Sequence, residues 1–177
     1  NQLWKSYFSY NEIIDVTNAN TSVYAATVNS VFTKNTTTGN INQTNAINGF
    51  KPESITCITH SDIVNKTFVG NTNGLLLVIN ADGSITQKVD IITEVPVPPN
   101  KKRINDLYEH NGRIYIATDY GISVLNATTL EFITTYFIGP NGEELEVLQT
   151  TVKDNEIYAV TRTNGIRKGD LNNPFLF

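Results

Sequence analysis

The stretch IYIATDYGISVLN, residues 114–126, holds two runs of alternating apolar and polar residues joined at Tyr120-Gly121. Successive side chains of a β-strand point to opposite faces, and glycine readily adopts the positive φ of a tight turn, so this pattern predicts a β-hairpin. A similar phrase, IYAVTRTNGIRKGD, begins at Ile157. Its recurrence indicates a chain built from repeated units.

The phrase occurs four times, and two markers within it give nearly the same period. Its aromatic residue recurs after 44, 47 and 43 residues, and its turn position after 44, 47 and 44. The aromatic positions are Tyr24, Phe68, Tyr115 and Tyr158, and the turn positions are Ser30, Gly74, Gly121 and Gly165. Four-stranded units that repeat every ~40–50 residues are typical of β-propellers.

A further alternating strand precedes each phrase, and the second and third phrases are followed by a turn and another strand. One unit is therefore a four-stranded antiparallel meander, or blade, and no helical period persists. A single blade cannot bury both of its faces, so neighbouring blades cover one another. The sequence predicts an all-β fold, a β-propeller with four blade-like four-stranded antiparallel repeats, as part of a larger propeller.

The expected domain organisation is one partial propeller over residues 1–177. The predicted blades are approximately residues 12–50, 54–95, 103–139 and 146–170, with an extra N-terminal strand at 3–10. Few residues follow Gly169, so the fourth blade is expected to lack its outer strand. The proline-rich stretch 93–103 is predicted to be a loop.

The terminal blades raise a question of assembly. The strand Leu3–Tyr10 could pair with Ile166–Gly169 and close a four-bladed ring, or two chains could meet end to end. We expect the second arrangement, a self-association through terminal blades, because blades of this size are typical of larger rings. The aromatic residues of the N-terminal strand are then expected to pack, although they could instead form a carbohydrate-stacking platform; they are Trp4, Tyr7, Phe8 and Tyr10.

Composition excludes several classes of partner. The chain has 13 Lys and Arg against 17 Asp and Glu, a formal net charge of −4, so no basic field would attract nucleic acid. No apolar run approaches the ~20 residues of a membrane span.

We interpret Asn1, which is not preceded by an initiator Met, as a mature N-terminus after removal of a signal peptide. Cys57 is the single cysteine and is predicted to be a small buried hydrophobe.

No catalytic or metal-binding constellation emerges from the motifs. His60 and His110 have no ligand partner at zinc spacing and are expected in solvent-facing turns. NADGS, residues 80–84, fits a hairpin turn better than a calcium loop. The acidic residues are scattered, with no pairing evident from sequence: Asp106, Asp119, Glu143, Glu144 and Glu146. We therefore expect no enzyme activity, no cofactor and no metal site.

One charge cluster is a candidate ligand-binding site. Lys101, Lys102 and Arg103 are the only three consecutive cations, and they adjoin the longest loop, where propellers place variable binding surface. Such a cluster could bind an anionic glycan through an exposed ionic attraction. The alternative is a solvated entrance to the next strand.

Four ordered stretches together resemble the N-terminal propellers of the PorZ family, from the type IX secretion system of certain Gram-negative bacteria. They are WKSYFSYNEI (4–13), NKTFVGNTNGLLLVI (65–79), KKRINDLYEHNGRIYIATDYGISVLN (101–126) and TTYFIGPNGEELEVLQTTVKDNEIYAVTRTNGI (134–166). The similarity extends along essentially the whole chain. Two positions depart from the family pattern: Asn71, where the family tends to have Tyr, and Val78, where it often has Asp.

The resemblance implies a non-enzymatic component of the attachment complex at the cell surface, associated with the outer membrane. It also implies partners similar to PorU, PorV and PorQ, and the binding of anionic lipopolysaccharide and its delivery to the sortase. One alternative is a periplasmic ligand-sensing propeller of a two-component regulator. Another is a propeller glycosidase or lyase, which would need two acidic side chains converging in a pocket.

Overall fold

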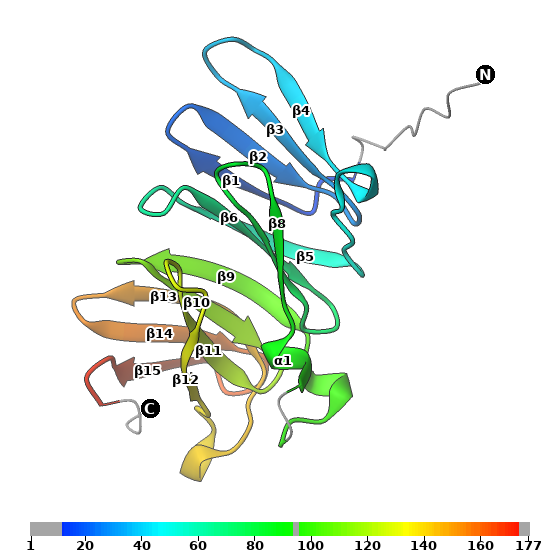
Figure 1. Ribbon diagram of the computed structural model, residues 1–177. Coiled ribbons are helices and arrows are strands. Elements are labelled where there is room, and N and C mark those ends of the chain that lie inside the picture. The colour runs from blue at the N-terminus through cyan, green and yellow to red at the C-terminus, as the bar shows by residue number, and fades with distance from the viewer. Residues whose placement is uncertain (1–11, 94–95, 174–177) are drawn as a thin grey trace.

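The computed structural model describes residues 12–93 and 96–173, and it confirms the all-β propeller fold. Four antiparallel sheets follow one another along the chain and stack face to face in an arc (Figure 1). We call them blades 1 to 4. The predicted N-terminal strand at 3–10 lies outside the described residues.

Each blade is a meander in which sequential strands are neighbours. Blade 1 contains β1 (Asp15–Ala19), β2 (Ser22–Ala26), β3 (Val31–Asn35) and β4 (Ile41–Thr44). Blade 2 contains β5 (Ile55–Ser61), β6 (Lys66–Asn71), β7 (Leu76–Ile79) and β8 (Ile85–Lys88). Blade 3 contains β9 (Ile104–His110), β10 (Arg113–Thr118), β11 (Gly121–Asn126) and β12 (Phe132–Tyr136), and the described part of blade 4 contains β13 (Val147–Lys153), β14 (Glu156–Thr161) and β15 (Ile166–Asp170).

The hairpin at residues 114–126 is formed by β10 and β11, the two middle strands of blade 3. Tyr115 pairs with Val124 on β11 and with Tyr108 on β9. Gly121 opens β11 with φ 152, and a Cβ at this position would lie 2.3 Å from the carbonyl oxygen of Tyr136. Both the backbone conformation and the close approach therefore require glycine here.

Strand pairing defines equivalent positions in the four blades. The repeated aromatics pair with Thr17, Thr59, Tyr108 and Thr151 of the first strands. Counting back two residues from each partner gives one further equivalent position, occupied by Asp15, Cys57, Asp106 and Gln149.

Carboxylates at this position connect successive blades. Asp15 accepts hydrogen bonds from the backbone N–H of Val16 at 2.8 Å and, across to blade 2, from that of Ile58 at 2.9 Å. Asp106 similarly accepts from the N–H of Thr150 in blade 4, at 3.5 Å. The first strands are thus joined by side-chain-to-backbone bonds as well as by apolar packing.

The apolar core is divided into three layers, one between each pair of neighbouring blades. Ala26 and Val31 of blade 1 pack with Ile58 and Val69 of blade 2. Phe68, Leu76 and Val78 of blade 2 meet Ile114, Ile116 and Leu125 of blade 3, and Tyr115, Ala117 and Ile122 of blade 3 meet Val152, Ile157 and Ala159 of blade 4. Cys57 belongs to the second layer, and burial raises the pKa of its thiol to about 12, as expected for a buried hydrophobe.

The prediction of a loop over residues 93–103 is partly wrong. The short helix α1 (Asp90–Thr93) reaches into this stretch, and a 3₁₀ turn covers Pro99–Lys101. Proline suits the first turn of a helix because its φ is already fixed and its missing N–H would have no partner there. Ile91 and Val97 anchor the segment in the layer between blades 2 and 3. Two further 3₁₀ turns lie at Ala46–Asn48 and Pro140–Gly142.

Blade 4 has three strands within the described residues, in the order β13-β14-β15. After β15 the chain turns and forms an isolated bridge between Asp170 and Asn173. Over residues 12–93 and 96–173, no helix is long and apolar enough to cross a membrane.

Candidate functional site

The three cations predicted as a ligand site do not share one surface. Lys101 forms an ion pair with Glu144, with 2.6 Å between Nζ and Oε2. Lys102 is only 6% exposed, and its ammonium donates to the carbonyl oxygen of Ile92 in α1. Arg103 is exposed, and its Nε donates to Oδ1 of Asn105 at 3.1 Å. Lys102 thus ties the loop to the helix, while Arg103 points outward.

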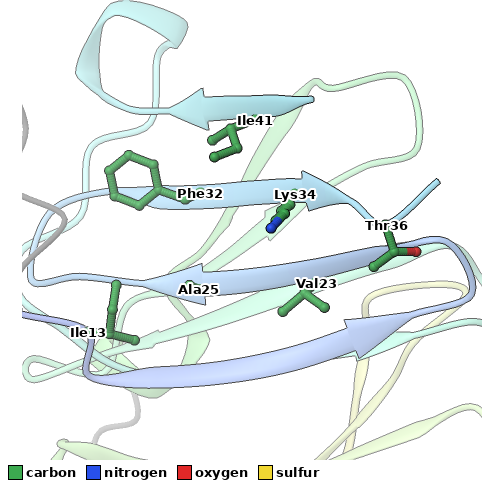
Figure 2. Close-up of a pocket in the computed structure, with 7 residues that line it drawn as sticks. All are labelled: Ile13, Val23, Ala25, Phe32, Lys34, Thr36 and Ile41. Carbon is green, nitrogen blue, oxygen red and sulfur yellow. The ribbon is translucent and has the colours of Figure 1, made fainter. Parts of the chain in front are cut away.

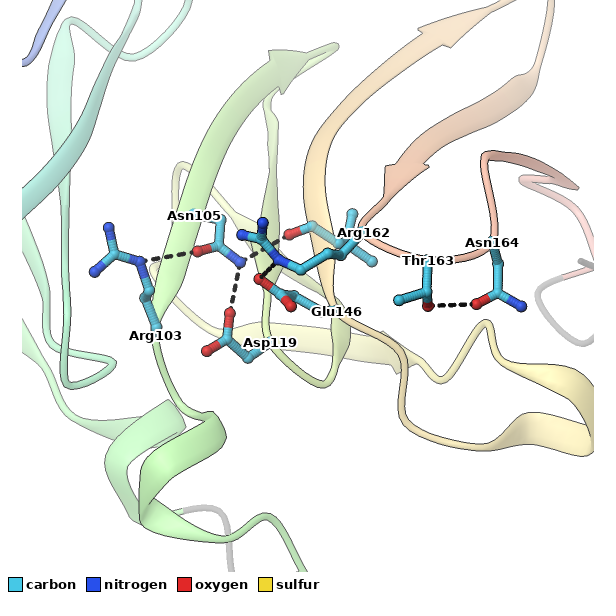
Figure 3. Close-up of polar contacts among 8 residues, drawn as sticks. Arg103, Asn105, Asp119, Glu146, Arg162, Thr163 and Asn164 are labelled. Atoms are coloured by element: carbon cyan, nitrogen blue, oxygen red, sulfur yellow. Dashed lines mark hydrogen bonds and ion pairs between the residues drawn. The ribbon is translucent and has the colours of Figure 1, made fainter.

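Arg103 belongs to a polar cluster at one end of blades 3 and 4, which we call the end-face cluster (Figure 3). Asn105 stands at its centre, because its Nδ2 donates both to Oδ1 of Asp119 at 2.8 Å and to the carbonyl oxygen of Val147 at 2.9 Å. The second bond crosses from blade 3 to blade 4. The members of the cluster are Arg103, Asn105, Asp119, Glu146, Arg162, Thr163 and Asn164.

The blade 4 part of the cluster comes from the entry to β13 and the turn between β14 and β15. Arg162 pairs with Glu146, with 2.7 Å between Nε and Oε1, and its side chain is 60% exposed. Thr163 donates to Oδ1 of Asn164 at 2.7 Å, and the N–H of Asn164 donates to the hydroxyl of Thr161 at 3.0 Å. These bonds hold the turn that presents Arg162.

The repeat explains why these residues meet. In each of blades 2, 3 and 4, the first residue after the second strand donates its N–H to the carbonyl oxygen of the residue that precedes the first strand. The bonds are Thr72 to Ser54 at 3.0 Å, Asp119 to Arg103 at 3.3 Å and Arg162 to Glu146 at 3.2 Å. Blade 3 therefore has Arg at the strand entry and Asp in the turn, whereas blade 4 has Glu at the entry and Arg in the turn. Aligning the repeats could have identified Arg162, because it occupies the same position after the second strand as Asp119 does in blade 3. No sequence motif indicates it.

The electrostatics of the cluster single out Arg103. Lys101 and Arg162 are paired with carboxylates, which offset their charge. The bond described for Arg103 goes instead to a neutral amide, and the other two guanidinium nitrogens point away from Asn105 (Figure 3). A guanidinium can form two parallel hydrogen bonds to a carboxylate or phosphate, so this arrangement can bind an anion.

Four of the five acidic residues singled out in the sequence have structural partners through their side chains. Glu144 and Glu146 form ion pairs, Asp119 accepts from Asn105, and Asp106 joins blades 3 and 4. Within the described part of the chain, no group of three or more His, Cys, Asp or Glu side chains could hold a metal ion.

The expectation that His60 faces solvent is wrong. Strand β5 continues to Ser61, so His60 lies inside the strand, and its side chain is 2% exposed. The ring stacks on Tyr24 of blade 1 with centroids 5.2 Å apart, and Nδ1 lies 2.9 Å from the hydroxyl of Thr67. Burial lowers the pKa of His60, against the raising effect of nearby Asp62. His110 lies at the end of β9 beside Tyr108 and is partly buried.

Stacked four-stranded meanders with polar turns gathered at one end define a β-propeller, a class in which strands form the scaffold and loops the binding surface. The sequence matches the family described as the type IX secretion system PorZ N-terminal β-propeller domain over residues 23–176. The chain belongs to this family. No match was found among curated proteins.

Solved structures share the fold at low sequence identity. PorZ of Porphyromonas gingivalis, described as an essential bacterial surface component of the type IX secretion system, matches with a TM-score of 0.79 and 15% identity over 97% of this chain. This chain spans 22% of that PorZ chain. The extracellular domain of BT3049 from B. thetaiotaomicron, assigned to a hybrid two-component system, gives a TM-score of 0.70 and 23% identity over 94% of this chain and 22% of its own. The computationally designed protein Ika4 gives a TM-score of 0.67 and 14% identity over 96% of this chain and 98% of its own.

Proposed function

We propose that this protein is a non-enzymatic propeller segment of a cell-surface component of the type IX secretion system. Its role is that of a scaffold in the attachment complex, with partners similar to PorU, PorV and PorQ. The observation that carries the proposal is family membership over residues 23–176. The fold similarity to PorZ, a surface component of that system, supports it.

The proposed ligand is anionic lipopolysaccharide, which the complex delivers to the sortase. Arg103 is the proposed first contact, because its guanidinium faces outward and its described partner is a neutral amide. Lys101, half-exposed beside it, adds positive charge when an anion competes with Glu144. Lys102 serves the site indirectly by anchoring the loop through Ile92.

Gene deletion in the source organism tests the role in secretion. Cargo proteins should then remain unprocessed and unattached to the cell surface, which immunoblots of cell and medium fractions would show. Normal processing and attachment of cargo in the deletion strain would refute the role in secretion.

Titration of purified anionic lipopolysaccharide against the chain tests the ligand. Arg103→Glu should weaken binding at low salt, and added salt should weaken wild-type binding, because the screening length falls from ~10 Å at 0.1 M to ~3 Å at 1 M. The matched control is Lys153→Glu, an exposed cation at the other end of β13. Equal affinity of the wild type and Arg103→Glu would refute the assignment of Arg103.

A second candidate function is ligand sensing in a two-component regulator. The fold similarity to the extracellular domain of BT3049 favours this alternative. The two functions differ in the rest of the gene, since a sensor requires a membrane span followed by a kinase. They also differ in phenotype, because loss of a sensor changes transcription and leaves cargo attachment intact.

A further inference from the structure

Blade 1 borders a hollow on its outer face and another between itself and blade 2. The first is apolar apart from Lys34 and Thr36 (Figure 2). No blade within the described residues packs against that outer face, so its exposure does not indicate a ligand. The second, which we call the hairpin hollow, is walled by hairpins of two neighbouring blades and has a volume of about 400 Å³. Protein ligand sites commonly measure ~300–1,000 Å³.

The hairpin hollow lies where the β1–β2 turn meets the β5–β6 turn, at the end of the blades opposite the end-face cluster. Its lining is polar, and Asp62 is the one charged residue among those that line it. The other polar side chains of the lining each offer an oxygen acceptor; they belong to Asn20, Thr21, Ser22, Tyr24 and Asn65. None of these side chains forms a hydrogen bond within the described part of the chain, so their acceptors are available to a ligand.

Asp62 is held in place by blade 1, but its charge is not offset. Its Oδ1 accepts from the N–H of Asn20 at 3.2 Å, and its side chain is 48% exposed. Lys66, the nearest cation along the chain, donates instead to the carbonyl oxygens of Ala127 and Thr128, at 3.3 and 3.1 Å. Over residues 12–93 and 96–173, no Lys or Arg forms an ion pair with Asp62.

The ring of His60 provides a second observation beside Asp62. Its side chain is 2% exposed, and its Nε2 lies 3.5 Å from Oδ1 of Asp62. This nitrogen has no hydrogen-bond partner among the described residues, although buried polar atoms are nearly always hydrogen-bonded. Burial also lowers the pKa of His60, which keeps the ring neutral at pH 7. Asp62 and His60 together therefore lack a positive charge, which a proton or a cationic ligand can supply.

We propose that the hairpin hollow is a binding site for a primary ammonium group. Ammonium carries three N–H donors and no acceptor, so it fits a lining that combines one carboxylate with neutral oxygen acceptors. Hydrogen bonds to a charged group are stronger than those between neutral groups, which favours ammonium over a hydroxyl. A lysine side chain of a partner protein and a free amine both present this group. The site is independent of the proposed function, whose anionic ligand is assigned to the opposite end of the blades.

Binding of ammonium should compete with protonation of His60. A protonated ring can donate from Nε2 to Asp62, which offsets the carboxylate and repels a second cation. The titratable side chains against His60 are Asp62 and Tyr24, and its other hydrogen-bond partners are Thr17 and Thr67. Of these side-chain types, histidine is the one that ordinarily changes its charge between pH 5 and 8. The affinity for ammonium should therefore fall as the pH drops from 7 to 5.

An NMR titration of the isotope-labelled chain at low salt tests the proposal, with Nα-acetyl-lysine amide as the probe. At pH 7 the backbone signals of residues 19–22 and 62–65 should shift and saturate. Asp62→Asn keeps an acceptor for the N–H of Asn20 but removes the charge, so it should weaken binding by at least about 10-fold. Asp154→Asn is the matched control, because Asp154 is an exposed carboxylate in the equivalent turn of blade 4, between β13 and β14, and it should leave the affinity unchanged.

Two further probes identify the chemistry of the ligand. Nα-acetyl-norleucine amide has a similar chain without the ammonium and should not bind. Ethanolamine presents the ammonium on a free amine: weaker binding than the lysine derivative would assign the site to a protein side chain, and equal binding would assign it to small amines. His60→Phe should lose most of the fall in affinity between pH 7 and 5. Circular dichroism of each variant checks that the fold is intact.

Three results would overturn the proposal. The first is a wild-type chain whose signals show no saturable shift with the lysine derivative. The second is an Asp62→Asn chain that binds this probe as tightly as the wild type, and the third is equal binding of the norleucine derivative. A loss of affinity at pH 5 that is as large in His60→Phe as in the wild type would exclude competition with His60.

Discussion

The bond between Asp15 and the N–H of Ile58 offers a sharp test of how carboxylates hold the blades together. Asp15→Asn preserves the size of the side chain but replaces one acceptor oxygen with a donor. Because the two carboxylate oxygens accept from the N–H groups of Val16 and Ile58, one of those N–H groups must then face a donor. Hydrogen bonds to charged groups contribute about 1.5–3 kcal/mol, and part is recovered by reorientation of the amide and by water. We expect a loss of about 1–2 kcal/mol.

The equivalent change in blade 3, Asp106→Asn, should have a smaller effect. The acceptor distance to the N–H of Thr150 is 3.5 Å, at the limit for a hydrogen bond, and burial raises the pKa of Asp106. A folded-state pKa above the unfolded value means that ionisation of Asp106 opposes folding at neutral pH. Removing the charge offsets the weakened bond, and the net change should stay below about 1 kcal/mol.

Urea unfolding at pH 7, followed by fluorescence and circular dichroism, measures both free energies of unfolding. Glu53→Gln is the control for loss of one negative charge, because Glu53 is exposed between blades 1 and 2. The reasoning fails if Asp106→Asn destabilises as much as Asp15→Asn, or if Asp15→Asn behaves like the control.

Three further predictions concern buried groups. Burial raises the pKa of Cys57 to about 12, so its thiol should react with a thiol reagent at pH 8 only in denaturant, and rapid labelling of the native protein would contradict this. The free energy of unfolding should also fall as pH rises from ~8.5 towards 12, because the unfolded chain loses the thiol proton first. Because burial lowers the pKa of His60, the free energy of unfolding should fall as pH drops below ~6.5, and His60→Phe should reduce that dependence in urea titrations at pH 5 and 7. Gly70→Ala would place a Cβ 2.6 Å from both Cys57 and Ile104, so it should lower the free energy of unfolding by about 1–3 kcal/mol; an unchanged melting temperature would show that the contact relaxes without strain.

Repetition made the fold readable from the sequence, because four copies of one pattern reinforce each weak local signal. The alternation around Tyr115 and the turn at Gly121 specify a hairpin through side-chain direction and backbone φ alone. The PorZ family resemblance is likewise confirmed. Both features are determined by the order of residues along the chain, so they can be predicted from the sequence.

Side-chain environments within the blades were harder to predict. Three consecutive cations suggest one positive surface, yet the 3₁₀ turn at Pro99–Lys101 sends Lys102 inward towards Ile92 and Lys101 towards Glu144. The prediction that His60 faces solvent is wrong because β5 continues past the histidine and places its ring against Tyr24. In both cases the deciding partner lies on another element, so the outcome depends on packing that a local pattern does not encode.

The side-chain bonds that join the first strands of neighbouring blades have one further property, which is that each spans nearly the same length of chain. The links from Ile58 to Asp15, from Thr150 to Asp106 and from Asn105 to Val147 span 43, 44 and 42 residues. Each of these connections is to a nearest neighbour, as in linear repeat proteins, whose stability is a sum of unit and interface terms. A newly synthesised blade can therefore form these bonds with the blade before it, so the chain can fold progressively during synthesis.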